Sequence, residues 1–452
     1  MKLLILLSVC FWPLQSECGY PDDNSYVKNI YWWKDVNFEN LPLKEDAYIG
    51  KYPYYIPTNN NILGVSYHAQ SGLMFACIGR LREGIPSTLN AFCISDYSKG
   101  TSPYIWGFPN YEVNTLKASD YDYEKQPSSY YQKDLRIIST YHPTIDDSCN
   151  RAYVVDTGVV RAKDGKRYQV QNPAIVVFEL PSNGCVSRNF PVIVRVEIPD
   201  SLWYDSLGFV YLTIDHQTKK GGCDNPMLYI TNIVDRSIIV YDYSKNEFWK
   251  FDNHPSFDPV ESETYLGDYQ IRYGVLSMTL GWPDKKGNRI VYYAPGSTLA
   301  SYATTTKTLR NQKKSSSTHA DGEFRMVGYH GCDGQIHRQF LDLNCGVMFF
   351  AQMNSGAVKC WNVAKPFNPN YIGVVYKSDD QELFTDIQVD SEGYLWMHSC
   401  KVNVIFGSTE DLDLSEYNSR THRVKVIDAI KGTVCENDYG IGDEITWQYM
   451  AH

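Results

Sequence analysis

A hairpin pattern that recurs six times constrains the fold of this chain more than any other feature. Each copy is an apolar or alternating run, a turn built on Gly, Asn or Cys-Asn, and a second such run. The copies span residues 62–78, 144–158, 209–230, 276–293, 340–350 and 387–397. Their turns become closer along the chain: 77 residues separate Gly72 from Cys149, and 49 residues separate Asn344 from Gly393. The sequence therefore predicts six similar β-units in a row.

Six such units predict an all-β, six-bladed propeller. A lone hairpin with an apolar face is marginal in water, and radial repetition supplies further strands and neighbouring sheets to bury it. The content of 36 Tyr, 18 Phe and 10 Trp also favours strands. No change in composition marks a linker, so we expect one propeller domain over residues 19–452. A pair of unrelated β-sandwiches is the alternative, because turn-rich alternation occurs in any all-β protein.

The N-terminus is typical of a secreted protein. Lys2 precedes a largely apolar run over residues 3–14, and small or polar residues follow over 15–19. This pattern predicts a signal peptide at residues 1–18. No later run is long enough to cross a bilayer, so we expect an extracellular protein without a membrane partner. The net charge of −10 argues against nucleic acid as a partner.

The twelve cysteines fit export, because disulfides persist in oxidising compartments. There is no Cys-x-x-Cys and no Cys/His cluster with zinc spacing, so no metal site is predicted. Their positions suggest three pairs: Cys77–Cys93 and Cys332–Cys345, each flanking a turn region, and Cys360–Cys435, which would fasten the chain end to an interior sheet and help to close the ring. Cys185 and Cys400 then either pair, or Cys400 is a buried free thiol.

Ten short motifs occur in an order that resembles the insect Yellow and major royal jelly protein family. They cover nearly the whole mature chain: 33–38 (WKDVNF), 56–60 (IPTNN), 63–65 (LGV), 80–89 (RLREGIPSTL), 153–158 (YVVDTG), 173–178 (PAIVVF), 229–232 (YITN), 239–242 (IVYD), 358–362 (VKCWN) and 432–435 (GTVC). The resemblance implies a secreted six-bladed propeller, in agreement with the hairpins. It also implies two disulfides, Cys149–Cys223 and Cys360–Cys435.

The resemblance further implies a ligand site in the sixth repeat. Salivary members from blood-feeding flies bind biogenic amines at one mouth of the central channel. Thr385 fits the family's pocket pattern, whereas Cys400 replaces an Asn and Val402 replaces an aromatic residue, which would weaken stacking on a ligand ring. His398 lies in the same stretch, although a satisfied core position is the alternative for it. The expected partner is a small aromatic amine or a catechol derivative.

Resemblance to some Yellow proteins also implies dopachrome conversion, an isomerisation of the melanin pathway that needs no cofactor. Removal of a proton from carbon requires a base with a pKa near neutrality, for which His is best suited. Five histidines lie in or beside the hairpins, and the sequence selects none of them as catalytic: His68, His142, His216, His337 and His398.

Two other classes of protein remain open. A calcium-dependent hydrolase would need oxygens that converge from several repeats, and six aspartates are spread suitably: Asp146, Asp147, Asp156, Asp215, Asp386 and Asp390. Aspartate at a hairpin turn, however, usually makes local backbone hydrogen bonds. A structural protein of cuticle or eggshell, with extracellular matrix as its partner, would use tyrosines for cross-links, and four lie in one polar stretch: Tyr121, Tyr123, Tyr130 and Tyr131.

Overall fold

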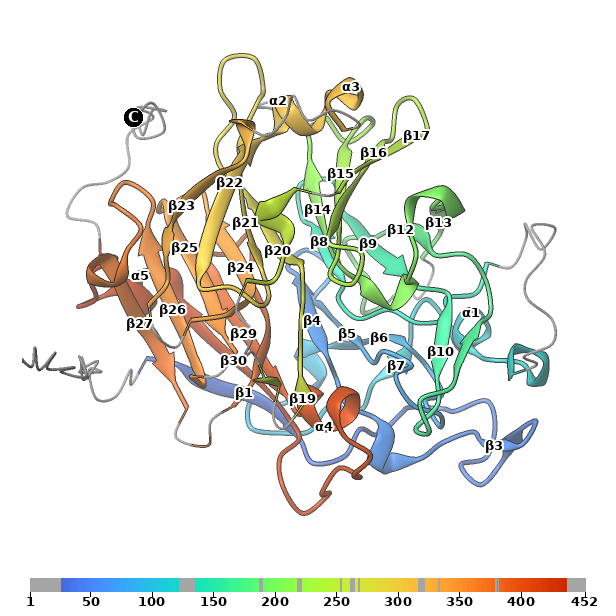
Figure 1. The fold of residues 1–452 in the computed structure, drawn as a ribbon. Coiled ribbons are helices and arrows are strands. Elements are labelled where there is room, and N and C mark those ends of the chain that lie inside the picture. The colour runs from blue at the N-terminus through green and yellow to red at the C-terminus, as the bar shows by residue number, and fades with distance from the viewer. Residues whose placement is uncertain are drawn as a thin grey trace, which may run out of the picture.

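Six four-stranded antiparallel sheets form the body of the protein in a computed structural model of the chain (Figure 1). The structure describes residues 26–436 except 122–134, 187–189, 218–221, 253, 261–264, 267–268, 316–321, 332–333, 354, 379 and 381. The first strand of each sheet packs against the first strand of the next, and the last sheet returns to the first. The chain is therefore the six-bladed propeller that the hairpins predict.

The blades follow one another along the chain, and the innermost strand of each comes first. Blade 1 has β4 (Gly64–His68), β5 (Leu73–Cys77), β6 (Leu89–Cys93) and β7 (Trp106–Gly107). Blade 2 has β8 (Thr144–Asp146), β9 (Arg151–Asp156), β12 (Ala174–Glu179) and β13 (Val192–Glu197). Blade 3 has β14 (Phe209–Asp215), β15 (Met227–Asn232), β16 (Ser237–Asp242) and β17 (Glu247–Phe251).

The second half of the ring repeats this order. Blade 4 has β20 (Val275–Leu280), β21 (Ile290–Pro295), β22 (Ala300–Thr305) and β23 (Arg325–Tyr329). Blade 5 has β24 (Ile336–Asp342), β25 (Val347–Gln352), β26 (Ala357–Asn362) and β27 (Ile372–Lys377). Blade 6 has β28 (Phe384–Val389), β29 (Tyr394–Cys400), β30 (Ser419–Lys425) and, from the other end of the chain, β1 (Lys28–Trp33).

Short elements in the connections complete the fold. Three two-stranded pairs are β2 (Tyr48–Ile49) with β3 (Tyr52–Pro53), β10 (Val159–Arg161) with β11 (Arg167–Gln169), and β18 (Tyr265–Leu266) with β19 (Tyr269–Gln270). The α-helices are α1 (Tyr111–Asn114), α2 (Thr306–Leu309), α3 (Gln312–Ser315), α4 (Val402–Gly407) and α5 (Val426–Ile430). Over the described ranges, no helix has the length and apolar character needed to cross a membrane.

The predicted hairpins are the two inner strands of each blade. Gly72, Gly287 and Gly393 lie in these turns with φ of 70°, 77° and 76°, a region that favours glycine. Aspartate ends several inner strands and accepts hydrogen bonds from the turn that follows: Asp342 from the Asn344 amide at 3.0 Å, for example. Local turn chemistry therefore sets the repeat, although the turn near Gly221 lies partly outside the described residues.

Both faces of each blade are buried, because an apolar cluster fills the space between every two neighbours. Blade 3 illustrates the pattern on β15. Met227 and Tyr229 pack toward blade 4, whereas Leu228 and Ile230 pack toward blade 2. Four further clusters join the other neighbouring pairs, including blade 6 with blade 1. Side chains alternate along a strand, so strands that are apolar throughout are what a radial array requires.

The N-terminal strand closes the ring. β1 pairs antiparallel with β30, from Lys28 opposite Arg423 to Trp33 opposite Ser419. In Figure 1 the blue β1 lies beside the red β30. The Cys360–Cys435 disulfide holds the segment after α5 against β26 of blade 5, as predicted, with a Cα–Cα distance of 6.1 Å.

Two of the predicted disulfides are present and one is wrong. Cys149–Cys223 joins the inner hairpins of blades 2 and 3. Cys77 and Cys93 do not pair: in the β5–β6 register Cys77 lies opposite Leu89, at the other end of the hairpin from Cys93. Cys93 instead bonds to Cys185, and Cys77 and Cys400 are buried free thiols. Cys332 lies outside the described residues, so its pairing with Cys345 stays a prediction.

Candidate functional site

Helix α4 covers the mouth of the propeller axis at the end where the inner strands begin. Val402 and Phe406 on this helix pack in one apolar cluster with Tyr211, Leu276 and Leu383, which belong to blades 3, 4 and 6. Figure 1 shows α4 below the inner strands, opposite the end that carries α2 and α3. Apolar side chains of a short helix therefore close this end of the axis.

Arg82 holds α4 in place. Its side chain comes from the loop between β5 and β6 and is 1% exposed. The guanidinium donates to the Asn59 side-chain oxygen at 3.4 Å and to several main-chain carbonyls. Four of the acceptors are main-chain carbonyls of α4 and the turn after it: Ile405 at 3.3 Å, Val404 at 2.6 Å, Ser408 at 2.9 Å and Glu410 at 2.6 Å. Arg82, the third residue of the motif RLREGIPSTL, thus holds α4 over the mouth of the axis.

A cavity of about 690 Å³ opens beside α4, between blades 5 and 6. This volume lies in the range that holds small-molecule ligands. Its residues come from the turn after β25, the start of β28, the end of β29 and the segment from α4 to β30: Met353, Gly356, Asp380, Glu382, Leu383, Ser399, Cys400, Lys401, Asn403, Glu416, Tyr417, Asn418, Ser419 and Arg420. We call this cavity the mouth pocket.

The charged groups of the mouth pocket are largely paired with one another. Arg420 donates to Glu382 at 2.9 Å and to Asp380 at 2.7 Å. Burial raises the pKa of Glu382, but hydrogen bonds from His422 and Ser399 and the charge of Arg420 outweigh it and bring this pKa to about 2. The Asp380 side chain is 68% exposed at the rim of the pocket. The pocket is therefore polar at its rim and apolar at Leu383 and Met353.

A polar cluster lies on the axis beneath the apolar cluster of α4. Asp386 accepts from His142 Nδ1 at 3.1 Å, and Arg338 Nε lies 3.4 Å from the other Asp386 oxygen. The Arg338 guanidinium stacks on the Tyr211 ring at 4.1 Å, and the Tyr211 hydroxyl lies 3.1 Å from His337 Nδ1. These five residues, which we call the axis cluster, come from blades 2, 3, 5 and 6.

Register shifts near the beginning of the inner strands direct these side chains toward the axis. The ladder between the first two strands shifts register between Phe209 and Leu212 in blade 3, between Ile336 and Gln339 in blade 5, and between Phe384 and Asp386 in blade 6. Tyr211, His337, Arg338 and Thr385 lie within these shifts. A bulge redirects side chains locally, so residues that regular alternation would send elsewhere reach the centre of the ring.

Both histidines of the axis cluster are neutral at neutral pH. Burial lowers the pKa of His142, although its hydrogen bond to Asp386 opposes the shift. Burial, with a contribution from His142, brings the pKa of His337 to about 3. With Nδ1 of His142 directed at Asp386, the Nε2 lone pair of this ring is available as a base. Gly64 makes room for the pair, since a Cβ there would collide with His142 Nδ1.

The predicted ligand residues lie together, with one exception. The Thr385 hydroxyl donates to the Leu63 carbonyl at 2.6 Å and lies 3.4 Å from Cys400 Sγ, and both residues are buried. Val402 is the first residue of α4. His398 is in the interior of blade 6, where its ring nitrogens bond to Thr421 and to the Ile62 carbonyl, both at 2.9 Å. Of the four, Cys400 lines the mouth pocket.

The other histidines have structural positions. His68 is fully buried and bonds to Ser71 and Asn150 at the hairpin of blade 1. His216 bonds to Asp146 at 2.9 Å across the hairpins of blades 2 and 3. The structure therefore distinguishes His142, with its carboxylate partner on the axis, from the remaining candidates.

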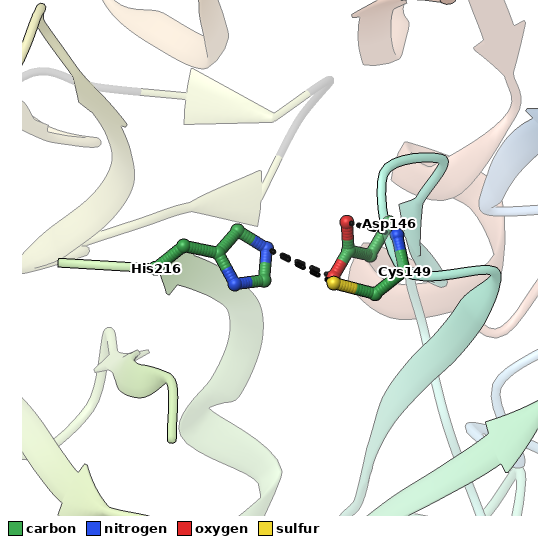
Figure 2. Close-up of side chains that lie close together, drawn as sticks. All are labelled: Asp146, Cys149 and His216. Atoms are coloured by element: carbon green, nitrogen blue, oxygen red, sulfur yellow. Dashed lines mark hydrogen bonds and ion pairs between the residues drawn. The ribbon is translucent and has the colours of Figure 1, made fainter. Parts of the chain in front are cut away.

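The aspartates that a calcium-dependent hydrolase would need do not converge on one site in the described part of the chain, because they make separate contacts. Asp156 accepts from the amides of Ile138 and Ser139, and Asp390 accepts from the amides of its own hairpin. In the described part of the chain, one group of side chains has metal-binding spacing: Asp146, Cys149 and His216. Figure 2 shows the His216 ring directed at the other two residues. Cys149 is bonded to Cys223, so it offers no thiolate and the group does not fit a metal.

The Asp146–His216 pair should make stability depend on pH. Burial lowers the pKa of His216 and raises that of Asp146, but their hydrogen bond outweighs it, so the pKa of His216 ends above 6.5 and that of Asp146 below 3.8. The contribution of His216 is complete below pH 6.5 and is lost as the pH rises through its raised pKa. That of Asp146 is lost as the pH falls through its lowered pKa. The pair therefore stabilises the fold most between these limits.

We expect His216→Gln to lower the free energy of unfolding by about 2 kcal/mol at pH 5.5 and by clearly less at pH 8.5. Denaturant unfolding at the two pH values measures this. His254→Gln, in the connection between β17 of blade 3 and blade 4, removes a histidine away from this pair and is the control. A His216→Gln effect that is equal at both values would contradict the ion pair.

The fold and the pocket assign the protein to a structural class: six-bladed propellers whose loops form a ligand-sized pocket beside one mouth of the axis. A model of the major royal jelly protein family matches residues 138–435. The chain is 31% identical over 404 residues to the Yellow-related salivary protein SP03 of Phlebotomus perniciosus, covering 88% of this chain and 90% of that protein. The chain therefore belongs to the major royal jelly protein family.

Two further relatives show the breadth of the similarity. The chain is 32% identical over 405 residues to the Yellow-related salivary protein SP04 of Phlebotomus argentipes, with 87% of each chain covered. It is 29% identical over 386 residues to L-dopachrome tautomerase yellow-f of Drosophila melanogaster, covering 84% of this chain and 83% of that protein. The similar proteins thus include both proteins named for saliva and a protein named for an enzymatic activity.

Proposed function

We propose that the protein is secreted and binds a small aromatic ligand, a biogenic amine or a catechol derivative, in the mouth pocket. The observation that carries this proposal is the cavity of about 690 Å³ that has Cys400 and Leu383 in its wall, next to Thr385. Secretion is supported by the apolar N-terminal run and by three disulfides. The predicted signal peptide, residues 1–18, lies outside the described residues.

The wall of the mouth pocket suits an aromatic amine. Leu383 and Met353 offer apolar surface, and Tyr417 offers an aromatic ring. Asp380 and Glu416 are 68% and 62% exposed at the rim, so their carboxylates can attract a protonated amine despite their pairing with Arg420 and Lys401. Val402 packs into the α4 cluster and, as an aliphatic side chain, offers no ring for stacking on a ligand.

Isothermal titration with dopamine, serotonin and octopamine tests the proposal. We expect saturable binding of at least one amine, weakened about tenfold in the double variant Asp380→Asn/Glu416→Gln because the carboxylates at the rim are gone. Glu392→Gln is a matched control, since this carboxylate lies in the hairpin at the opposite end of blade 6. The absence of saturable heat with all three amines would contradict the proposal.

A second candidate function is dopachrome tautomerisation. The relative named for this activity suggests it, and the buried His142–Asp386 pair favours it because Nε2 of His142 is available to take a proton from carbon. The measurement is dopachrome decay followed by absorbance. We expect His142→Gln to slow the catalysed decay about a hundredfold or more, with His254→Gln as the control. Equal decay with and without the wild-type protein would exclude this function.

A further inference from the structure

The Arg338 guanidinium lies on the axis, and the surrounding residues accept hydrogen bonds from only part of it. Its side chain is 10% exposed, Nε lies 3.4 Å from Asp386 Oδ1, and the guanidinium stacks on Tyr211. Nη1 is buried and has no hydrogen-bond acceptor among the residues that the structure describes. A buried charged donor without an acceptor is costly. A ligand oxygen placed beside Nη1 would therefore satisfy this unpaired donor.

None of the described neighbours of Arg338 accepts a hydrogen bond from Nη1, and their polar atoms make other contacts. Asp386 accepts from His142 through Oδ2 and from the Ile387 amide, at 3.0 Å, through Oδ1. The Tyr211 hydroxyl donates to the Thr385 carbonyl at 2.5 Å and lies within hydrogen-bond distance of His337. Cys77 and Cys400 nearby are neutral thiols, since burial raises the pKa of both.

Side chains that line the mouth pocket also pack near the axis cluster. Leu383 and Met353 line the pocket and also pack in the apolar cluster that contains Tyr211. Cys400 lines the pocket and lies 3.4 Å from the Thr385 hydroxyl, one residue before Asp386. Leu383 and Cys400 therefore lie between the pocket and the axis cluster, and a substituent of a ligand ring in the pocket would have to displace them to reach Arg338.

We propose that Arg338 binds the acidic group of the ligand, so that the pocket selects aromatic acids over otherwise identical molecules without a carboxylate. This inference rests on the proposed binding function and names its ligand class. The planar guanidinium matches a carboxylate in shape and charge. Seclusion from water strengthens the contact. Stacking on Tyr211 holds the guanidinium in the orientation that the contact needs.

Isothermal titration with two matched pairs of probes tests the inference: L-dopa against dopamine, and dihydroxyphenylacetate against methylcatechol. In each pair the wild type should bind the acid about tenfold or more tightly. Arg338→Gln should abolish this preference and leave the affinity for dopamine and methylcatechol unchanged. Arg423→Gln is the matched control, because this arginine also stacks on an aromatic ring, at 3.5 Å from Tyr394, but lies away from the axis.

The outcomes separate this inference from the function on which it rests. Equal binding of acid and partner by the wild type, or a preference that survives in Arg338→Gln, would overturn the role of Arg338 and leave the pocket proposal standing. Failure of all four probes to bind would overturn this inference, and would overturn the pocket proposal as well when serotonin and octopamine also fail to bind. Where thermal melting shows that Arg338→Gln does not fold, Arg338→Lys replaces it. That variant keeps a charge and loses the planar fork, so it should reduce the preference several-fold, and an unchanged preference counts against the inference.

Discussion

Replacing Arg80 by methionine should lower the free energy of unfolding by about 4 kcal/mol or more. Arg80 is 1% exposed and donates to the carbonyls of five residues: Ile85, Pro86, Asn114, Ile137 and Ile138. They belong to the loop after β5, to α1 and to the chain that enters blade 2. Methionine fills similar space but leaves these buried oxygens without donors. Burial lowers the pKa of Arg80 to about 10, so the side chain is still charged at neutral pH.

Denaturant unfolding and the yield of soluble protein measure this effect. Arg236→Met is the control, because Arg236 and its partner Asp258 are both about half exposed and such pairs contribute little. We expect the control to remain within about 0.5 kcal/mol of the wild type. An Arg80→Met protein that unfolds at the wild-type denaturant concentration would show that these hydrogen bonds do not stabilise the first two blades.

Replacing Arg82 by methionine should release α4 from the mouth. The four carbonyls that Arg82 binds all belong to residues 404–410, so their loss acts on one segment. We expect amide hydrogen exchange to accelerate about a hundredfold at Val404 and Ile405, whose amides bond to the Lys401 carbonyl. Exchange in the six blades should change little.

The same Arg236→Met control applies to this experiment. A faster exchange confined to the α4 segment would establish that Arg82 sets the closure of the mouth. Unchanged protection at Val404 and Ile405 would mean that Val402 and Phe406, through their apolar contacts, hold the helix without Arg82. Ligand titration of the Arg82→Met protein then reports whether a looser α4 changes access to the mouth pocket.

Turn chemistry explains why the propeller could be predicted from the sequence. Each blade begins with a hairpin whose turn carries glycine, asparagine or aspartate, and these signals are local. The closing strand β1 could not be assigned in this way. It pairs with β30, from the opposite end of the described chain, and nothing near Lys28–Trp33 identifies that partner.

The disulfides show the same division between local and long-range information. Cys77 and Cys93 flank a turn region, and symmetry about that turn suggested a bond. The β5–β6 register instead places Leu73 opposite Cys93 and leaves that thiol to Cys185, which arrives from the loop after β12 of the next blade. A shift of pairing by a few residues changes which side chains meet.

The axis cluster was the part of the site that the sequence did not reveal. Family motifs pointed to Thr385 and Cys400, which lie 3.4 Å apart and whose role in ligand binding stays a prediction. His142 was one of five equivalent histidines, and Arg338 had no signal. Tyr211, His337 and Arg338 reach the axis through register shifts, so the alternation rule that locates core residues in regular strands fails for them. A search for polar residues at the starts of the inner strands would have found the cluster.

A crystal structure of the protein soaked with L-dopa or dopamine is the direct test of ligand binding in the mouth pocket. We expect ligand density in this pocket, with the ring against Leu383, Cys400 and Tyr417 beside α4. For L-dopa we expect the carboxylate to be directed toward Arg338. An empty mouth pocket in crystals that hold the ligand elsewhere on the propeller would contradict the proposal.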